Sequence, residues 1–142
     1  MDRIRQLRKL YSEQKEASWR RSRREALFSP EEYRHQGEHN GWSLAAKQAG
    51  VAARLVSKGL RAEDALRFLR AELKRFLIEF QRYASVNARY AFNESYHAGV
   101  VHALREALDA ARAPSRRARR GSRRQKRLPM EPGALTGAGQ RS

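Results

Sequence analysis

The sequence predicts an all-α protein: a small bundle of about four helices with a basic N-terminal helix, a long C-terminal helical hairpin and a disordered basic C-terminal tail. Apolar residues recur at three- and four-residue spacing over much of the chain as far as residue 112. No segment shows the apolar–polar alternation of a strand. From Pro114 onward, proline, glycine and arginine replace the apolar residues, which predicts disorder in the free chain. We expect a basic helix at 1–29, a helical core domain at 30–112 and an Arg-rich tail at 113–142.

The first predicted helix covers residues 3–27. Its opening turns carry a rough apolar stripe formed by Ile4, Leu7, Leu10 and Tyr11. After Tyr11 the stripe lapses and a cluster of arginines follows, so most of this helix is expected to face solvent or a partner.

The second helix has a clear start signal at Ser29-Pro30-Glu31-Glu32. Ser29 is expected to cap it, proline suits the first helical position, and Glu32 completes a capping box. Gly37 and Asn40-Gly41 are breakers, so this helix is expected to be short. Another helix is expected at about 44–58, capped by Ser43 and ended by Gly59.

The last two predicted helices are the clearest. Residues 62–84 carry leucines and phenylalanines at helical spacing, and residues 88–112 carry a matching apolar side. They are expected to pair as an antiparallel hairpin, with residues 30–58 packed across them.

Charge points to the class of partner. The 142 residues have a formal net charge of +16 and a pI of about 11.3. Residues 1–29 and 114–142 carry +5 and +8, whereas residues 30–113 carry only +3. Such a surplus favours binding to a polyanion, because neutralised phosphates release counterions. Arginine far outnumbers lysine, and its planar fork fits phosphates and bases, which favours nucleic acid.

Several classes are excluded or disfavoured. The chain has no cysteine, which excludes disulfides, thiolate zinc sites and cysteine nucleophiles. No apolar run is long enough to span a membrane, and residues 1–10 do not form a secretory signal. We therefore expect no membrane partner and an intracellular location: the cytoplasm, or the nucleus or nucleolus in a eukaryotic host.

The residues expected to carry phosphate contacts form two arginine clusters. They are Arg20, Arg21, Arg23, Arg24, Arg116, Arg117, Arg119, Arg120, Arg123, Arg124, Lys126 and Arg127. Secondary contacts are expected from Trp19, Arg54 and Lys58. The stretch from Trp19 to Arg24 resembles the arginine-rich helices that enter RNA grooves. The alternative is a solvated helical face with Trp19 packed on the body.

A second resemblance lies between residues 42 and 60. Ala46, Gly50, Val51, Val56 and Ser57 fall where a bacterial repressor-type helix-turn-helix places its small residue, turn glycine and buried valines. The resemblance implies a second helix in the DNA major groove. The residues near DNA would then be Ala52, Ala53, Arg54 and Lys58. The alternative is one uninterrupted helix from residue 44 to 58.

The four histidines occur in pairs, and their spacing makes them candidate metal ligands. His35 to His39 matches the His-x-x-Glu-His pattern of inverted zinc peptidases, and Glu32/His35 and Glu94/His97 have the spacing of di-metal carboxylate sites. Glycine inside the first motif and too few further glutamates favour surface or capping roles. We expect no catalytic residue, no metal and no cofactor.

These observations together predict a non-enzymatic nucleic-acid-binding protein for RNA or DNA, such as a viral or mobile-element regulator or a component of an RNA–protein particle. Three alternatives stay open: a helical protein–protein adaptor localised by its basic tails, a helix-turn-helix regulator, and a His/Glu metal-dependent enzyme. A homodimer or protein partner is expected to use the helical core, which is small for a chain of this length.

Overall fold

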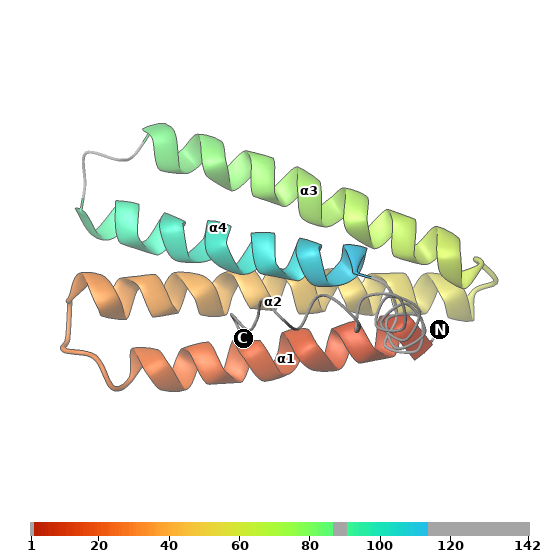
Figure 1. Ribbon diagram of the computed structural model, residues 1–142, viewed down its shortest axis with the longest axis horizontal. Coiled ribbons are helices and arrows are strands. Elements are labelled where there is room, and N and C mark those ends of the chain that lie inside the picture. Colours follow the sequence, from red (N-terminus) through yellow and green to blue (C-terminus); the bar gives the residue numbers. More distant parts are fainter. Residues whose placement is uncertain (1, 87–90, 114–142) are drawn as a thin grey trace, which may run out of the picture. The chain divides into compact units, whose positions relative to one another are not determined.

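The computed structural model describes residues 2–86 and 91–113, which form four α-helices and, within those residues, no strand. The helices are α1 (Asp2–Ser22), α2 (Pro30–Ser57), α3 (Ala62–Val86) and α4 (Ala91–Arg112). They pack as a bundle in which each helix runs opposite to the one before it (Figure 1). The all-α prediction and the antiparallel α3–α4 hairpin are confirmed.

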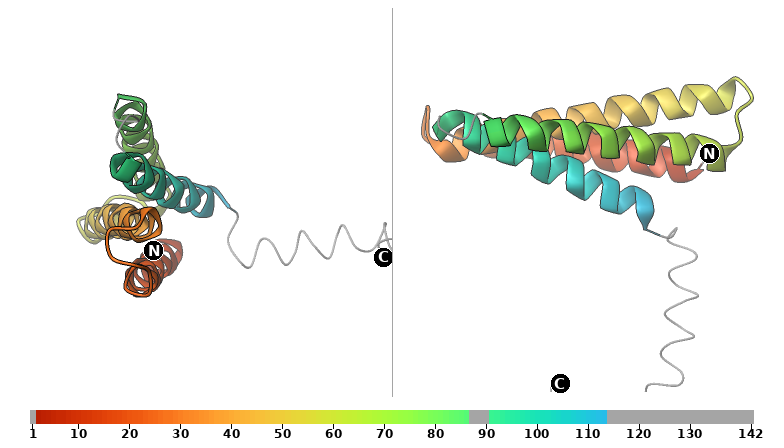
Figure 2. Two further views of the ribbon diagram at one scale, coloured as in Figure 1. Left: turned by 90° about the vertical axis from the view of Figure 1, so that its left-hand side faces the viewer. Right: turned by 90° about the horizontal axis from the view of Figure 1, so that it is seen from above.

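Helices α2 and α4 form the centre of the bundle. They run in the same direction, with α1 packed on α2 and α3 packed mainly on α4 (Figures 1 and 2). The four helices make up one compact unit. Ile4, Leu7 and Tyr11 of α1 are buried in the same core as the apolar residues of the other helices.

Helix α2 corrects the prediction of two shorter helices. It runs unbroken for 28 residues through Gly37, Gly41 and Gly50, and Ser43 does not cap anything. Its hydroxyl instead donates to the His39 carbonyl one turn earlier, at 2.9 Å. Gly37 and Gly41 are accommodated because close packing against α4 leaves no room for a side chain, whereas Gly50 faces only the Arg8 side chain and is tolerated within the helix.

The α2–α4 contact is made by small residues at four-residue spacing. Those of α2 are Gly37, Gly41, Ala45 and Ala49, and those of α4 are Gly99, Ala103, Ala107 and Ala111, all of them buried. A Cβ added to Gly37 would lie 2.0 Å from the Tyr96 carbonyl oxygen, and one added to Gly99 would lie 2.0 Å from the Arg34 carbonyl oxygen. The two backbones therefore approach so closely that no side chain fits between them at these points.

The ends of α2 follow the sequence signals. Ser29 Oγ accepts the Glu32 N–H at 3.1 Å, and Pro30 occupies the first turn. The Glu32 carboxylate accepts the Phe28 N–H at 2.6 Å, one residue before the position that a standard capping box uses. At the other end Gly59 has a φ of 112°, and the N–H groups of Gly59 and Leu60 bond to the carbonyls of Val56 and Leu55. This is a Schellman motif, which needs a residue without a Cβ at Gly59.

Helix α1 is shorter than expected and ends at Ser22 rather than near residue 27. Its buried face continues past Tyr11 through Ser18 and Ser22, which are 0% and 2% exposed. The Ser22 hydroxyl donates to the Trp19 carbonyl at 2.7 Å, so this buried polar group is satisfied.

Tyr11 connects α1 to the C-terminal half of α4. Its ring lies 5.8 Å from that of Trp42, and its hydroxyl donates to the Ala107 carbonyl at 2.8 Å. Burial raises the pKa of the Tyr11 phenol well above its ordinary value, and the Arg3 charge opposes this only in part.

Replacing Gly99 by alanine is expected to destabilise the bundle by about 1–3 kcal/mol, because its Cβ would meet the Arg34 backbone. Gly50→Ala is the matched control. Its Cβ would meet only the Arg8 side chain at 3.6 Å, so the better helix former should stabilise the protein by about 0.5–1 kcal/mol. Urea unfolding of both variants measures this. Equal destabilisation by the two alanines would contradict the close α2–α4 contact.

The raised pKa of Tyr11 predicts a loss of stability in alkali. The folded state favours the neutral phenol, so its contribution is complete below the unfolded pKa of about 10 and declines as pH rises above it. Tyr11→Phe should lower the free energy of unfolding by about 1 kcal/mol at pH 8, because the hydrogen bond is lost. Between pH 8 and pH 11 the free energy of unfolding of this variant should nevertheless fall less steeply than that of the parent. The measurement is urea unfolding at both pH values, and identical declines would contradict the burial of Tyr11.

Candidate nucleic-acid interface

The C-terminal end of α1 and the turn after it present three exposed arginines. Arg20 lies in the last turn of the helix, and Arg23 and Arg24 lie in the turn that follows. Among the residues that the structure describes, none of these three guanidinium groups is within 4.0 Å of a carboxylate oxygen. Their charge is therefore presented to solvent without a neutralising partner on the protein.

Arg21 differs from its neighbours. Its Nη2 lies 3.6 Å from the Glu38 carboxylate of α2 and donates to Ser18 Oγ at 3.0 Å. Glu38 is only 7% exposed, and it also faces Arg34 at 3.8 Å and the His35 Nδ1 at 2.9 Å. Arg21 consequently helps to hold α1 against α2.

Trp19 is partly packed and partly open. Its ring lies 5.2 Å from that of His39, whose Nδ1–H donates to the Lys15 carbonyl at 3.0 Å, and the residue is 40% exposed. One part of the indole therefore belongs to the α1–α2 contact, while the rest remains accessible beside the arginines.

Arg54 and Lys58 lie at the opposite end of the bundle. Both are exposed, Arg54 in the last turn of α2 and Lys58 at its C-cap. The helix-turn-helix alternative is wrong, because Gly50 lies inside a continuous helix with no turn between residues 44 and 57. The alternative of one uninterrupted helix is correct, and Gly50 lacks the positive φ that a turn glycine would have.

The end of α4 is capped by arginines from two other helices. Arg3 of α1 donates to the Ala110 carbonyl, and Arg70 of α3 donates to the Ala111 carbonyl at 2.9 Å. These cations satisfy carbonyls that have no partner within the helix and oppose the negative end of its dipole.

The second arginine cluster lies outside the described residues. It consists of Arg116, Arg117, Arg119, Arg120, Arg123, Arg124, Lys126 and Arg127. The expected disorder of residues 113–142 likewise falls almost wholly outside them, since only Ala113 is described.

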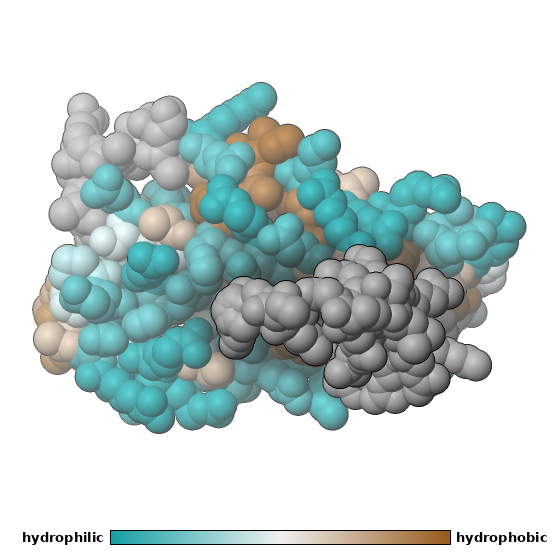
Figure 3. Space-filling view, viewed as in Figure 1, coloured by the Kyte–Doolittle hydropathy of each residue, from teal (hydrophilic) through white to brown (hydrophobic). Residues whose placement is uncertain are grey.

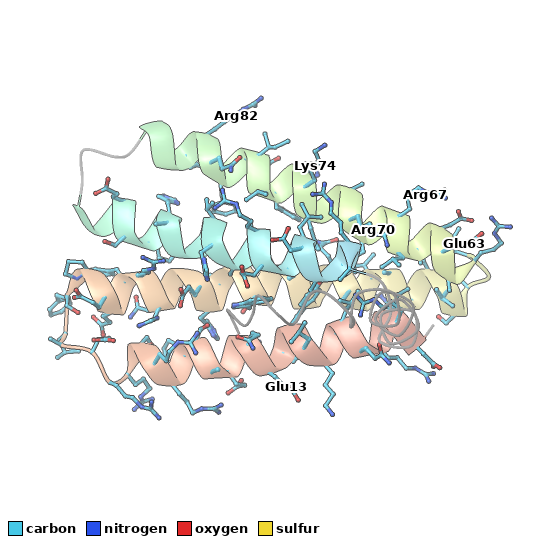
Figure 4. All side chains as sticks on the ribbon, viewed as in Figure 1. Glu13, Glu63, Arg67, Arg70, Lys74 and Arg82 are labelled. Atoms are coloured by element: carbon cyan, nitrogen blue, oxygen red, sulfur yellow. The ribbon has the colours of Figure 1, made fainter. Side chains whose placement is uncertain are left out.

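Sequence reasoning missed the cations on α3. Arg67, Lys74 and Arg82 project from its outer side, whereas Arg70 turns toward the end of α4 (Figure 4). Arg67 pairs with Asp64 at 3.1 Å, but Lys74 and Arg82 have no carboxylate within 4.0 Å among the described residues. The positions of Arg67, Lys74 and Arg82 can be read from the sequence. The acidic residues of the same segment nearly balance its charge, so these cations did not stand out.

Apolar residues also reach the surface over α3 and its junction with α4. Hydrophilic residues cover much of the face in Figure 3, and apolar ones gather over α3 and its junction with α4. A groove of about 330 Å³ lies between α2, α3 and α4. Its lining residues are Asn40, Ser43, Leu44, Lys47, Phe80, Tyr96 and Val100. This lining contains one cation, Lys47, and no carboxylate.

Two histidines of the predicted pairs, His35 and His97, contact neighbouring side chains. His35 lies between Glu25 and Glu38, at 3.3 and 2.9 Å, and His97 lies among Phe80, Tyr83 and Tyr96. In the described part of the chain no three His, Asp or Glu side chains gather as metal ligands. None of its helices has the length and apolar character needed to cross a bilayer.

Comparison with models of protein families, with curated proteins and with solved structures finds no match to this chain.

Glu38 is expected to stabilise the α1–α2 end. Glu38→Gln keeps the size of the side chain but removes the charge that faces Arg21, Arg34 and His35, so we expect a loss of about 1–3 kcal/mol. Glu13→Gln is the control, because Glu13 is exposed on α1 (Figure 4) and should change stability by less than about 0.5 kcal/mol. Urea unfolding compares them, and matching effects would refute the role given to Glu38.

Proposed function

We propose that this protein is a non-enzymatic nucleic-acid-binding protein whose helical bundle presents unneutralised arginines to phosphate groups. The observation that carries the proposal is the set Arg20, Arg23 and Arg24, which is exposed at one end of the bundle with no carboxylate of the described residues beside it. The net charge of +16 supports a polyanionic partner.

The contrast with other arginines strengthens this proposal. Arg61 pairs with Glu63 and Asp64, Arg67 pairs with Asp64, and Arg75 pairs with Glu72 and Glu79. The chain thus neutralises these three arginines but leaves Arg20, Arg23 and Arg24 open. Lys74 and Arg82 of α3 likewise have no carboxylate partner among the described residues. Unpaired cations that repel one another in the free protein become favourable when phosphates replace their counterions.

Phosphate contacts of this kind predict weak sequence preference and a steep dependence on salt, because the phosphate backbone carries no base information. In this proposal the basic residues at 116–127 make further phosphate contacts and so steepen the salt dependence of binding. Roles that fit it are regulation in a virus or mobile element and assembly of an RNA–protein particle.

The combined variant Arg20→Ala/Arg23→Ala/Arg24→Ala should bind a nucleic acid more weakly and flatten its salt dependence. Removing three phosphate contacts should lower the slope of log K against log salt by about 2–3. Arg61→Ala/Arg67→Ala/Arg75→Ala removes the same net charge from paired positions and should change the slope by less than about 1. Fluorescence anisotropy over a salt series measures both. Equal slopes for the two variants would mean that net charge alone drives binding.

A protein–protein adaptor is the second candidate. Ile78 and Tyr83 are 41% and 55% exposed on α3, and they lie beside the partly buried Leu77 and Phe80. Deleting residues 114–142 separates the two functions. A nucleic-acid-binding protein should lose most of its affinity for nucleic acid, whereas an adaptor should keep its partner and lose only its location.

A further inference from the structure

The turn between α1 and α2 exposes two large apolar side chains side by side in sequence. Leu27 and Phe28 are 76% and 78% exposed, more than any other large apolar residue of the described chain. A single exposed apolar residue needs no explanation, but two adjacent ones at the tip of a turn form a contact point.

The backbone of this turn holds Phe28 in an uncommon conformation. Phe28 has a φ of 62°, which is rare for a bulky residue and is the only positive φ among the described non-glycine residues. Its N–H donates to Glu32 Oε1 at 2.6 Å, and the Ser29 N–H donates to the Ala26 carbonyl at 3.1 Å. Local hydrogen bonds therefore fix the turn, and the strain is retained although the ring packs little against the bundle.

The surroundings of the turn are cationic. Arg23 and Arg24 precede it within five residues, Arg20 closes the helix before it, and no carboxylate of the described chain pairs with them. Two of the nearby carboxylates are engaged, since Glu25 faces His35 and Glu32 caps α2. Glu31 is exposed in the first turn of α2. An exposed ring that follows unneutralised arginines closely in the chain suits a ligand with flat aromatic groups at short intervals along an anionic backbone.

We propose that the α1–α2 turn is a base-stacking contact: the ring of Phe28 stacks on an unpaired base while Arg20, Arg23 and Arg24 hold the adjoining phosphates. Phe28 thereby gives the protein a preference for single-stranded over double-stranded nucleic acid, since a paired base does not expose its face. The inference rests on the proposed function and adds the form of nucleic acid that this end of the bundle selects.

A lipid surface is the competing ligand, and the structure favours it less. The apolar face of α1 is buried in the core through Ile4, Leu7 and Tyr11, so no amphipathic face remains beside the turn to enter a bilayer. Only Leu27 and Phe28 could enter the bilayer, and two side chains bury little apolar surface there. A single ring, by contrast, is enough to stack on one base.

The test compares Phe28→Leu, which keeps an apolar side chain without the aromatic face, with Phe28→Trp, which keeps the stacking surface. The full chain and both variants are titrated with a single-stranded RNA, a single-stranded DNA and the matching duplexes. Phe28→Leu should weaken single-strand binding about 5- to 100-fold at unchanged salt slope and leave duplex binding within about twofold, and Phe28→Trp should restore it. Tyr83→Leu, at an exposed aromatic of α3, should have no such selective effect.

The outcomes separate the two proposals. If the full chain binds nucleic acid but Phe28→Leu binds single strands and duplexes as the parent does, or loses both equally, the stacking contact is refuted and the proposed function stands. If the full chain binds none of the four, the proposed function fails and the stacking contact fails with it. If Phe28→Leu reduces only binding to vesicles of phosphatidylcholine and phosphatidylserine, the turn is a membrane contact and the proposal is overturned.

Discussion

The direct approach of the α2 and α4 backbones is the constraint on which the structure depends. Small residues repeat every fourth position on both helices, and at Gly37 and Gly99 the neighbouring carbonyl oxygen occupies the place of a Cβ. Each glycine lowers helix propensity by about 1 kcal/mol relative to alanine, so packing must offset this loss. The contact also explains why a helix rich in apparent breakers remains continuous for 28 residues.

The other two helices take their positions from this pair. Tyr11 ties α1 to the Ala107 carbonyl, and Arg70 ties α3 to the Ala111 carbonyl, so both are anchored on the C-terminal half of α4. The opposite end of α1 is anchored through Glu38 on α2. This second anchor engages Arg21 but leaves Arg20, Arg23 and Arg24 outside it, and the fold thereby determines which arginines of one sequence cluster are available to a partner.

The sequence predicted features that depend on neighbours in the chain, such as helix ends, but not features that depend on contacts between helices. Ser29, Pro30 and Gly59 act through neighbours in the chain, so the ends of α2 were predicted. Gly37 and Gly41 disfavour a helix locally and become favourable only against α4, so the continuity of α2 was missed. The arginine cluster was visible, but the pairing of Arg21 with Glu38 joins residues on different helices. The burial of Ser18 and Ser22 was missed because a serine gives no apolar signal.

The central claim is that unneutralised arginines make this protein a ligand for nucleic-acid phosphates. The most direct measurement is the affinity of the unmodified chain for single- and double-stranded DNA and RNA of one sequence, each over a salt series. We expect binding that persists at about 150 mM salt, falls steeply as salt rises and is tighter for the single-stranded forms. Weak binding to all four at that salt concentration would contradict it.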